Sequence, residues 1–391
     1  MYIGIRITFT EPQAAPPQEF RVAIFEPKCI IPAMKRYALP FLCVCLTVSV
    51  FAQDGNLQRD EFDVTAEYFD KLGKLFRQSA NLAIPAVVNI KVTQNRSVGR
   101  SRSPKIPIEE SGSGIIAAIA QKHVILTNRH VIEEAEPNAI QILTHDRRIL
   151  TPIKIAANTD FDLAVIEVAE KLPPSVRFGD SDQVQVGDIV LAIGNPFGLD
   201  RSVSMGIISA LGRRHVPGAV GSTPRIGFFQ TDASVNPGSS GGMLLNVRGE
   251  VIGVLTAIAT QGGGNEGVAF VMPINVVLRI AEQLVQTGTV LKPHIGCNFE
   301  PTISSEERRT LDIDRLIGAK IKGIAAETPA ERAGLKAGDV VLMFGSTEVE
   351  DDLHVTHLIA QSEIDKPVVL RINRNREILN VTVTPAAQLS R

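Results

Sequence analysis

The chain contains few cysteines and carries almost no net charge. Four of its 391 residues are cysteine, and 40 basic residues against 42 acidic ones give a formal net charge of −2 at pH 7. Without a basic excess there is no long-range field to attract nucleic acid, so we expect no nucleic-acid partner. No group of cysteine, histidine or acidic residues has the spacing of a metal site, and we expect neither a metal nor another cofactor.

Long apolar runs are also missing. A membrane-spanning helix needs about 20 consecutive apolar residues, and the apolar stretch at residues 37–51 is shorter. Residues 34–52 begin with Met-Lys-Arg and end with Val-Phe-Ala, which is typical of a secretory signal peptide. We therefore expect residues 1–33 to be an upstream extension from a wrongly assigned start and the mature chain to begin near Gln53. A retained membrane anchor is the alternative.

The positions of the cysteines are consistent with export of the chain. Cys29, Cys43 and Cys45 lie in or before the signal segment, which leaves Cys297 as the one cysteine of the mature chain. No intramolecular disulfide can then form, and the simplest role of Cys297 is that of a small buried apolar side chain. With 44% hydrophobic and 21% charged residues, the chain is globular in composition and long enough for two or three domains.

A glycine-crowded turn at residues 236–245 is the most informative motif. It reads Asn-Pro-Gly-Ser-Ser-Gly-Gly-Met-Leu-Leu and sets the Ser240 hydroxyl among backbone amides that few side chains shield. Glycine permits unusual dihedral angles and close substrate approach, and converging amides stabilise the charge on an attacked carbonyl oxygen. We predict that Ser240 is a nucleophile and that the amides of Gly238, Ser239 and Ser240 form an oxyanion hole.

A serine nucleophile needs a base, and two candidate partners lie upstream. An apolar run that starts at residue 124 ends at His130, and Asp162 opens a β-rich run at residues 163–168. His130, Asp162 and Ser240 follow the chain order of the chymotrypsin-like proteases rather than that of subtilisins or α/β-hydrolases. Taken singly, each has a plain alternative: a surface or core histidine, a strand-ending aspartate and a flexible glycine loop.

Together these motifs resemble those of the HtrA/DegP family of serine proteases. The similarity covers nearly everything after residue 60 and implies a protease domain with a Ser-His-Asp triad, followed by one PDZ domain. Two positions depart from the expected pattern: Ser239 stands where the family commonly has asparagine, and Met243 where the wider clan often has proline. The matching stretches are Ser-Gly-Ser-Gly-Ile-Ile (111–116), Thr-Asn-Arg-His-Val (127–131), Asp-Leu-Ala-Val-Ile (162–166), Gly-Asn-Pro-Phe-Gly-Leu (194–199), Gly-Ile-Ile-Ser-Ala-Leu-Gly-Arg (206–213) and Gln-Thr-Asp-Ala-Ser-Val-Asn-Pro-Gly-Ser-Ser-Gly-Gly (230–242).

Residues 53–80 are expected to form a helical segment. Apolar side chains recur there at steps of three and four, which indicates one face of an amphipathic helix. Such a face must be buried against something. The resemblance implies that the segment helps to build a homotrimer or a multiple of trimers, and packing against the protein's own barrel is the alternative. The face comprises Phe62, Ala66, Phe69, Leu72 and Phe76.

Residues 81–288 are expected to form the protease domain. Short β-branched runs alternate with glycine, proline and asparagine, a pattern typical of an all-β barrel or sandwich. The three triad candidates come from both halves of this stretch, as a cleft between two barrels requires. The expected fold is therefore mainly β, with a chymotrypsin-like double β-barrel. A helix opened by Pro273 and ended by Gly288 follows the strands. The expected strands cover residues 87–92, 114–119, 124–127, 140–143, 163–168, 189–193, 251–259 and 268–271.

Residues 289–391 resemble a PDZ module and are expected to form a smaller α+β domain. The run Pro-Ala-Glu-Arg-Ala-Gly-Leu-Lys-Ala-Gly-Asp-Val-Val at 329–341 is close to that family's signature. A helix at 351–361 should flank a peptide groove with His354 and His357 nearby, although His357 could equally be an ordinary surface residue. In such domains a loop presents amides to a C-terminal carboxylate while a strand edge accepts the extended peptide. The resemblance assigns this loop to His294, Ile295, Gly296 and Cys297.

The resemblance implies a periplasmic endopeptidase of protein quality control and stress response, which degrades unfolded or damaged proteins and binds C-terminal peptides. No acidic residue within 231–239 stands at the pocket position of trypsin-like enzymes, and Val268 and Phe270 suggest apolar walls. Cleavage is therefore expected after small or medium aliphatic residues. Two alternatives stay open: a peptide-binding chaperone with an idle protease domain, and a sensor that cuts one specific partner.

Overall fold

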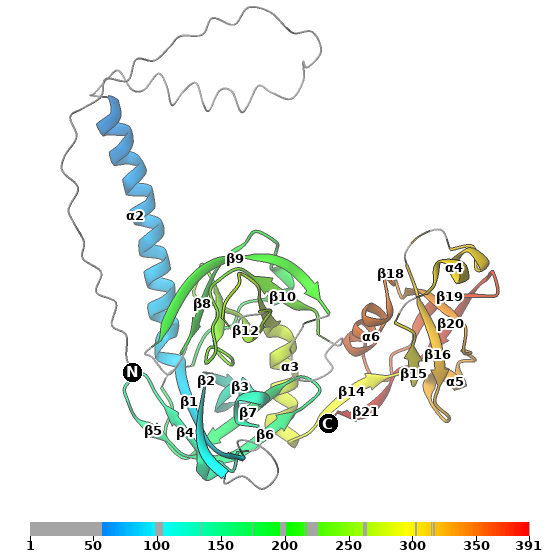
Figure 1. The fold of residues 1–391 in the computed structure, drawn as a ribbon, viewed down its shortest axis with the longest axis horizontal. Coiled ribbons are helices and arrows are strands. Elements are labelled where there is room, and N and C mark those ends of the chain that lie inside the picture. The colour runs from blue at the N-terminus through cyan, green and yellow to red at the C-terminus, as the bar shows by residue number, and fades with distance from the viewer. Residues whose placement is uncertain are drawn as a thin grey trace, which may run out of the picture. The chain divides into compact units, whose positions relative to one another are not determined.

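The computed structural model describes residues 57–390 apart from short internal gaps, and its strands outnumber its helices (Figure 1). The expected extension and signal segment, with Cys29, Cys43 and Cys45, lie outside the described residues. The chain divides into two compact units, Met1–Tyr68 and Phe69–Arg391. Both predicted globular domains belong to the second unit. The internal residues outside the description are 98–104, 134, 174, 196–200, 215, 217–225, 261–263, 302, 314 and 316.

Helix α2 (Leu57–Ala83) occupies the segment where a helix was expected. Its expected apolar face is only partly covered. Phe69 is 69% exposed and Leu72 is 38% exposed, whereas Phe76 packs against the core of the protease domain. Among the described residues, no helix is both long and apolar enough to cross a membrane.

The first half of the protease domain is a seven-stranded antiparallel sheet with the order β5-β4-β1-β2-β3-β7-β6. Only Thr151 separates its two edge strands along the chain, so the chain itself brings the edges together and the sheet curls. Strand β6 was not among the expected strands; only its first and last residues are buried, so it lacks a buried apolar run. The strands are β1 (Val87–Ser97), β2 (Lys105–Ile119), β3 (Lys122–Asn128), β4 (Ile140–Leu143), β5 (Ile149–Leu150), β6 (Pro152–Asn158) and β7 (Leu163–Val168).

The second half is a closed barrel with the order β10-β13-β12-β11-β8-β9. Together the two halves form the expected chymotrypsin-like double-barrel fold. Strand β11 begins directly after Gly242, the last glycine of the motif at residues 236–245, and Met243, its first residue, is fully buried. The methionine therefore anchors the turn to the core. The strands are β8 (Ile189–Gly194), β9 (Ser202–Arg213), β10 (Phe228–Thr231), β11 (Met243–Asn246), β12 (Val251–Ile258) and β13 (Ala269–Pro273).

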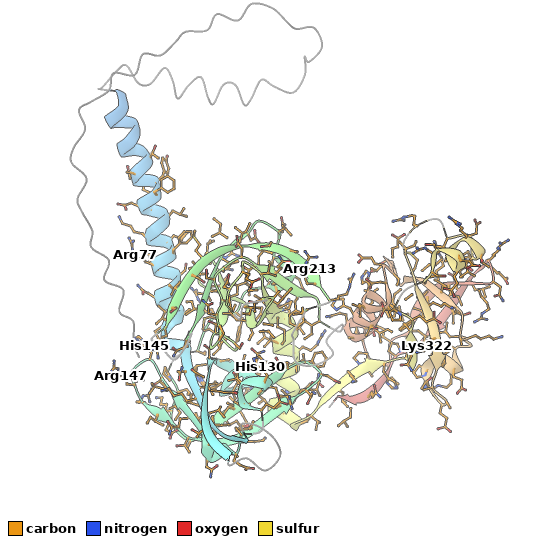
Figure 2. All side chains as sticks on the ribbon, in the orientation of Figure 1. Arg77, His130, His145, Arg147, Arg213 and Lys322 are labelled. Carbon is orange, nitrogen blue, oxygen red and sulfur yellow. The ribbon has the colours of Figure 1, made fainter. Side chains whose placement is uncertain are left out.

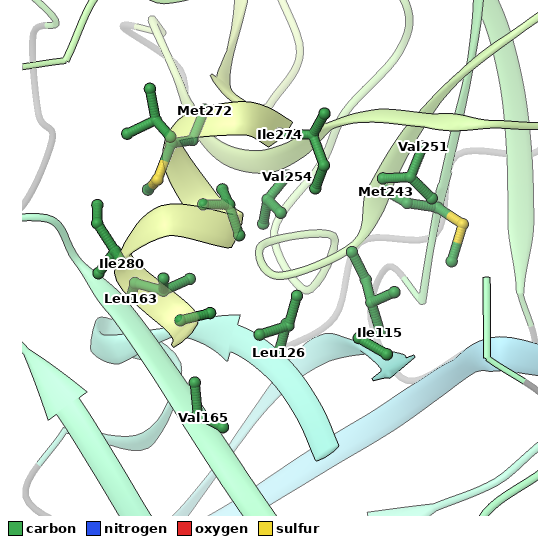
Figure 3. Close-up of a cluster of buried hydrophobic side chains, with 14 of the residues drawn as sticks. Ile115, Leu126, Leu163, Val165, Met243, Val251, Val254, Met272, Ile274 and Ile280 are labelled. Atoms are coloured by element: carbon green, nitrogen blue, oxygen red, sulfur yellow. The ribbon is translucent and has the colours of Figure 1, made fainter. Parts of the chain in front are cut away.

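Helix α3 (Ile274–Thr287) follows the barrel, with Pro273 as its N-cap and Gly288 as a left-handed C-cap at φ +74°. Its apolar face packs into a core shared by the two halves of the domain (Figure 3). This shared core fixes the first sheet against the barrel, because burying apolar surface contributes about 25 cal/mol per Å². The side chains labelled in Figure 3 are Ile115, Leu126, Leu163, Val165, Met243, Val251, Val254, Met272, Ile274 and Ile280.

The PDZ region has a separate core and a sheet with the order β15-β16-β17-β19-β20, in which β18 pairs with β17. Strands β14 and β21 pair with each other in a separate two-stranded sheet. In sequence, β14 precedes the strands of the larger sheet and β21 follows them. Strand β15 is an edge strand of the larger sheet. The elements are β14 (Val290–His294), β15 (Cys297–Phe299), α4 (Ser305–Thr310), β16 (Ala319–Ile324), α5 (Pro329–Arg332), β17 (Val340–Phe344), β18 (Thr347–Glu348), α6 (Asp352–Gln361), β19 (Val368–Arg374), β20 (Glu377–Val383) and β21 (Ala386–Ser390).

Candidate active site

Two neighbouring strands bring His130 and Asp162 together. His130 lies in a short 3-10 helix (Arg129–Ile132) directly after β3, and Asp162 lies directly before β7. These strands are antiparallel partners in which Asn128 stands opposite Leu163. The end of β3 and the start of β7 therefore coincide, and the two polar residues meet there. Figure 2 shows His130 where the first sheet faces the closed barrel.

The Asp162 carboxylate holds His130 at two points. Its Oδ2 lies 2.6 Å from His130 Nδ1, and its Oδ1 accepts a hydrogen bond from the His130 backbone N–H at 2.9 Å. Asp162 is 3% exposed, so water does not compete strongly for the carboxylate. A carboxylate at Nδ1 favours the tautomer with the proton on Nδ1. The Nε2 atom is then left as the free base.

Hydrogen bonds through two buried polar residues, Asn128 and Thr256, link Ser240 to Asp162. Its Oγ donates a hydrogen bond to the Thr256 carbonyl at 3.3 Å. The Thr256 hydroxyl accepts a hydrogen bond from Asn128 Nδ2 at 3.4 Å, and the same Nδ2 donates to the Asp162 carbonyl at 3.1 Å. Asn128 and Thr256 thus connect the glycine-crowded turn to Asp162 and, through Asp162, to His130. Neither residue was predicted from the sequence to have a role, although Asn128 belongs to the Thr-Asn-Arg-His-Val motif.

Hydrogen bonds within the glycine-crowded turn determine which of the three amides predicted for the oxyanion hole are available. The Ser239 N–H donates to the Asn236 carbonyl at 2.9 Å. An amide already engaged inside the turn cannot also point at a substrate oxygen, so in this conformation Ser239 is not a donor and that prediction is corrected. Gly238 has φ +93°, a left-handed value that glycine adopts readily. The amides of Gly238 and Ser240 remain the candidate donors.

Val268 and Phe270, which were expected to form apolar walls of the substrate pocket, pack against the core of the domain. Phe270 is 5% exposed and packs into the core between the two halves of the domain, and Val268 is half-buried against the same core. The alternation of side chains along β13 turns Phe270 inward. Its ring therefore forms part of the core and offers little surface to a substrate.

A groove of about 320 Å³ lies in the PDZ region between edge strand β15 and helix α6. All four predicted loop residues line it. Helix α6 contributes Thr356, Ile359 and Ala360. His354 is buried instead, with its Nδ1 accepting a hydrogen bond from the Glu350 N–H at 3.2 Å, and His357 does not line the groove. The helix flanks the groove, but neither His354 nor His357, which were expected near it, is among the residues that line it. The loop residues are His294, Ile295, Gly296 and Cys297.

Cys297 is half-buried and free, and its side chain packs against the PDZ core. Burial, with a smaller contribution from the Asp339 carboxylate, raises the pKa of the Cys297 thiol to about 12. The thiol is therefore protonated and unreactive at neutral pH. It serves as a weakly polar wall of the groove, slightly more exposed than the sequence suggested.

Two regions of the chain match known protein families. Residues 112–254 match a family model described as a trypsin-like peptidase domain, and residues 293–384 match one described as a PDZ domain. The combination defines the class of the protein: a trypsin-like peptidase domain joined to a PDZ domain.

Two curated proteins with similar sequences indicate a more specific class, the periplasmic serine endoproteases. A probable periplasmic serine endoprotease DegP-like of Halomonas elongata is 40% identical over 276 residues, which are 70% of this chain and 56% of that protein. A protein of the same name from Chlamydia muridarum is 37% identical over 273 residues, which are 70% of this chain and 53% of that protein. The chain thus spans just over half the length of these curated relatives.

Solved structures match over more of their length. The structure titled "HtrA-type protease AlgW with tripeptide" is 30% identical with a TM-score of 0.65, and the match covers 80% of this chain and 97% of that chain. "HtrA-type protease AlgW with decapeptide" matches at 29% identity and a TM-score of 0.65, with 80% and 98% covered. The chain belongs to the HtrA family.

Proposed function

We propose that the chain is a serine endopeptidase in which Ser240, His130 and Asp162 act as a catalytic triad. The observation that supports this most is the buried Asp162 carboxylate, which holds both the ring and the backbone of His130 in one orientation. Such a pairing prepares a histidine to act as a general base. The oriented base and the hydroxyl on a glycine-crowded turn share one small polar network through Asn128 and Thr256.

In the proposed reaction His130 Nε2 removes the Ser240 proton as Oγ attacks a peptide carbonyl. The imidazolium, stabilised by Asp162, then protonates the leaving amine, and water hydrolyses the acyl-enzyme by the same route. The amides of Gly238 and Ser240 stabilise the oxyanion. Because the Ser240 hydroxyl donates to the Thr256 carbonyl here, it must first rotate towards His130. Catalytic hydrogen bonds are often loose before substrate binds.

The assignment is tested by Ser240→Ala in the mature chain. Removing the nucleophile of a triad typically costs on the order of 10⁶ in turnover, while one half-exposed hydroxyl contributes little to stability. We expect no measurable hydrolysis of an unfolded test protein, loss of fluorophosphonate labelling and an unchanged melting temperature. His130→Ala should be similarly inactive. Cleavage by purified Ser240→Ala at more than a trace level would rule the triad out.

The PDZ groove is proposed to bind the C-termini of peptides. The carbonyls of Ile295 and Gly296 accept hydrogen bonds from the N–H groups of Ala330 and Ala325 at 2.8 and 2.9 Å. In a trans peptide the N–H points opposite to the carbonyl, so the amides of Gly296 and Cys297 point away from those partners. They are placed to receive a carboxylate, and edge strand β15 can pair with an extended peptide.

The names of the relatives support a proposal for the biological setting. Their names describe periplasmic serine endoproteases, and the signal-like residues 34–52 agree with export. We propose a periplasmic enzyme that degrades unfolded or damaged proteins. Digestion of an unfolded test protein distinguishes this from a sensor with one specific target, which would leave such a protein intact.

The exposed apolar side chains of α2 favour assembly over packing within one chain. Tyr68, Phe69 and Leu72 are exposed on consecutive turns, and exposed apolar surface of this kind marks an interaction site. A homotrimer or a multiple of trimers, as the family resemblance implies, would bury this surface.

A further inference from the structure

Ser113 is a fully buried polar residue on β2 that the proposed reaction does not use. It lies far in sequence from the catalytic turn, yet all three of its polar groups bond to the turn or to its surroundings. Its Oγ donates to the Gly238 carbonyl at 2.8 Å and accepts a hydrogen bond from the Asn195 N–H at 2.8 Å. Its backbone N–H donates to the Ser240 carbonyl at 2.8 Å. Its carbonyl accepts from the Thr127 hydroxyl at 2.7 Å.

These bonds fix one peptide group beside the candidate oxyanion hole. The peptide between Gly238 and Ser239 has its carbonyl bonded to Ser113 Oγ and its N–H bonded to the Asn236 carbonyl. With both ends engaged, that peptide cannot rotate unless two hydrogen bonds break. The Gly238 N–H precedes it by one residue and the Ser240 N–H follows it. Ser113 therefore constrains the amides on both sides of the peptide that it holds.

The space around Ser113 is closed as well. A Cβ added to Gly241 would lie 2.1 Å from the Ser113 carbonyl oxygen and 2.5 Å from Thr127 Oγ1. The turn thus sits against Ser113 without room for a side chain. Ser113 itself is 0% exposed, so removing its hydroxyl leaves the buried Gly238 carbonyl and Asn195 N–H without the partner that they have here.

From these contacts we propose that Ser113 is a positioning residue, which sets the turn so that the Gly238 and Ser240 amides converge on the oxyanion. The inference rests on the proposed peptidase activity. It concerns the transition state alone, because the Ser113 hydroxyl is buried behind the turn and bonds to the turn. Loss of the hydroxyl should lower the turnover number and leave the binding of substrate nearly unchanged.

The test compares Ser113→Ala with Ser111→Ala in the mature chain. Ser111 lies on the same strand two residues away, and its hydroxyl accepts a hydrogen bond from Asn89 Nδ2 at 3.1 Å. Ser111→Ala thus removes an equivalent hydroxyl group from the same strand without changing any hydrogen bond to the turn. The measurements are kcat and KM for a peptide substrate and the affinity for a peptide boronate, which forms a tetrahedral adduct on Ser240 and probes the oxyanion site.

For Ser113→Ala we expect kcat to fall by about tenfold to a hundredfold, less than the 10²–10³ lost with a direct oxyanion donor. KM should stay within about twofold, and boronate affinity should fall by the same factor as kcat. Ser111→Ala should match the wild type in all three. A Ser113→Ala protein with wild-type kcat and boronate affinity overturns the proposal, as does a change that Ser111→Ala reproduces.

A second variant covers the case in which Ser113→Ala does not fold. Thr127→Val keeps the volume of the side chain and removes only the bond to the Ser113 carbonyl. It should lower kcat and boronate affinity together, by a smaller factor, and an unchanged kcat would refute the inference. If the wild-type chain cleaves nothing, the proposed function fails and this inference fails with it. If the wild type cleaves and Ser113→Ala cleaves equally well, only the inference fails.

Discussion

At the scale of single residues, Asp162 combines an unusual backbone conformation with its proposed place in the triad. Its φ is +50°, in the left-handed region where aspartate and asparagine are tolerated better than other side chains. Both of its carboxylate oxygens accept hydrogen bonds from His130. An aspartate at this position therefore satisfies the turn and the histidine at once.

This dual role predicts how Asp162→Asn will behave. Asparagine keeps the left-handed turn, but its NH₂ group must face one of two donors on His130, so the ring loses its preferred tautomer. We expect kcat/KM to fall by about 10⁴, with a melting temperature close to that of the wild type. Asp162→Ala should lose stability as well, because alanine tolerates the left-handed region poorly. The prediction fails if Asp162→Asn retains kcat/KM within tenfold of the wild-type value.

The triad candidates could be predicted from sequence, whereas the residues that hold them could not. Ser240, His130 and Asp162 stand in motifs whose glycines or strand edges mark them. Ser113, Asn128 and Thr256 are buried polar residues, and a sequence does not reveal which polar groups will be buried together. The Ser239 amide was misassigned for a similar reason, because the hydrogen bonds inside a turn depend on its folded dihedral angles.

At the scale of elements, apolar runs predicted most strands of the protease domain, but the exposed strands β6 and β9 and the short buried strands β10 and β11 were not predicted. Strand β9 (Ser202–Arg213) carries serine, glycine and arginine, and only one of its residues is buried. Its place is set by pairing with β8 and β10 and not by its own pattern. The ends of α3 were predicted well, because Pro273 and Gly288 act locally.

Helix α6 contains a histidine that should make stability depend on pH. Burial lowers the pKa of His354, and the Arg214 guanidinium lowers it further, against the opposing carboxylates of Glu350 and Asp351. The unfolded chain therefore binds a proton more readily than the folded chain does. This destabilises the folded state as the pH falls below about 6.5. Protonation would also cost the hydrogen bond that His354 Nδ1 accepts from the Glu350 N–H.

We expect His354→Asn to weaken this dependence, since the asparagine oxygen can accept the same hydrogen bond and does not titrate. The measurement is the melting temperature between pH 7 and pH 5, which should fall less steeply for His354→Asn than for the wild type. His123→Asn, which changes an exposed histidine on β3, is the matched control and should follow the wild type. Parallel curves for all three proteins would contradict the role of His354.

At the scale of the whole molecule, the exposed face of α2 predicts self-association. Phe69 is 69% exposed, and an aspartate there would place a charge in any interface that buries it, which is costly. We expect Phe69→Asp to shift the protein to monomers in sedimentation analysis, while the wild type sediments as a trimer or a multiple of trimers. Lys74→Asp puts the same residue at an exposed position of the same helix and should leave assembly intact. A monomeric wild type would refute the proposed assembly outright.

Also at this scale, the PDZ groove adjoins the segment of chain that leads from the protease domain. The chain passes from the end of α3 at Thr287 into β14 within three residues, and Lys292, Pro293 and His294 of β14 line the groove. A peptide in the groove therefore contacts the segment that joins the two domains. Such a ligand can activate only if it binds the competent arrangement more tightly than the resting one.

We expect a peptide with an apolar C-terminus to raise the rate at which the mature chain hydrolyses a separate substrate. The reason is that its carboxylate would engage the Gly296 and Cys297 amides, and the Ser240 hydroxyl, which rests on the Thr256 carbonyl, would turn towards His130 more often. The measurement compares the free peptide with its C-terminal amide at equal concentrations. The amide should bind weakly and activate little, because it lacks the charge that the loop amides stabilise. If the amide activates as strongly as the acid, or neither changes the rate, carboxylate capture is not the switch. The groove would then serve to tether substrates near the active site.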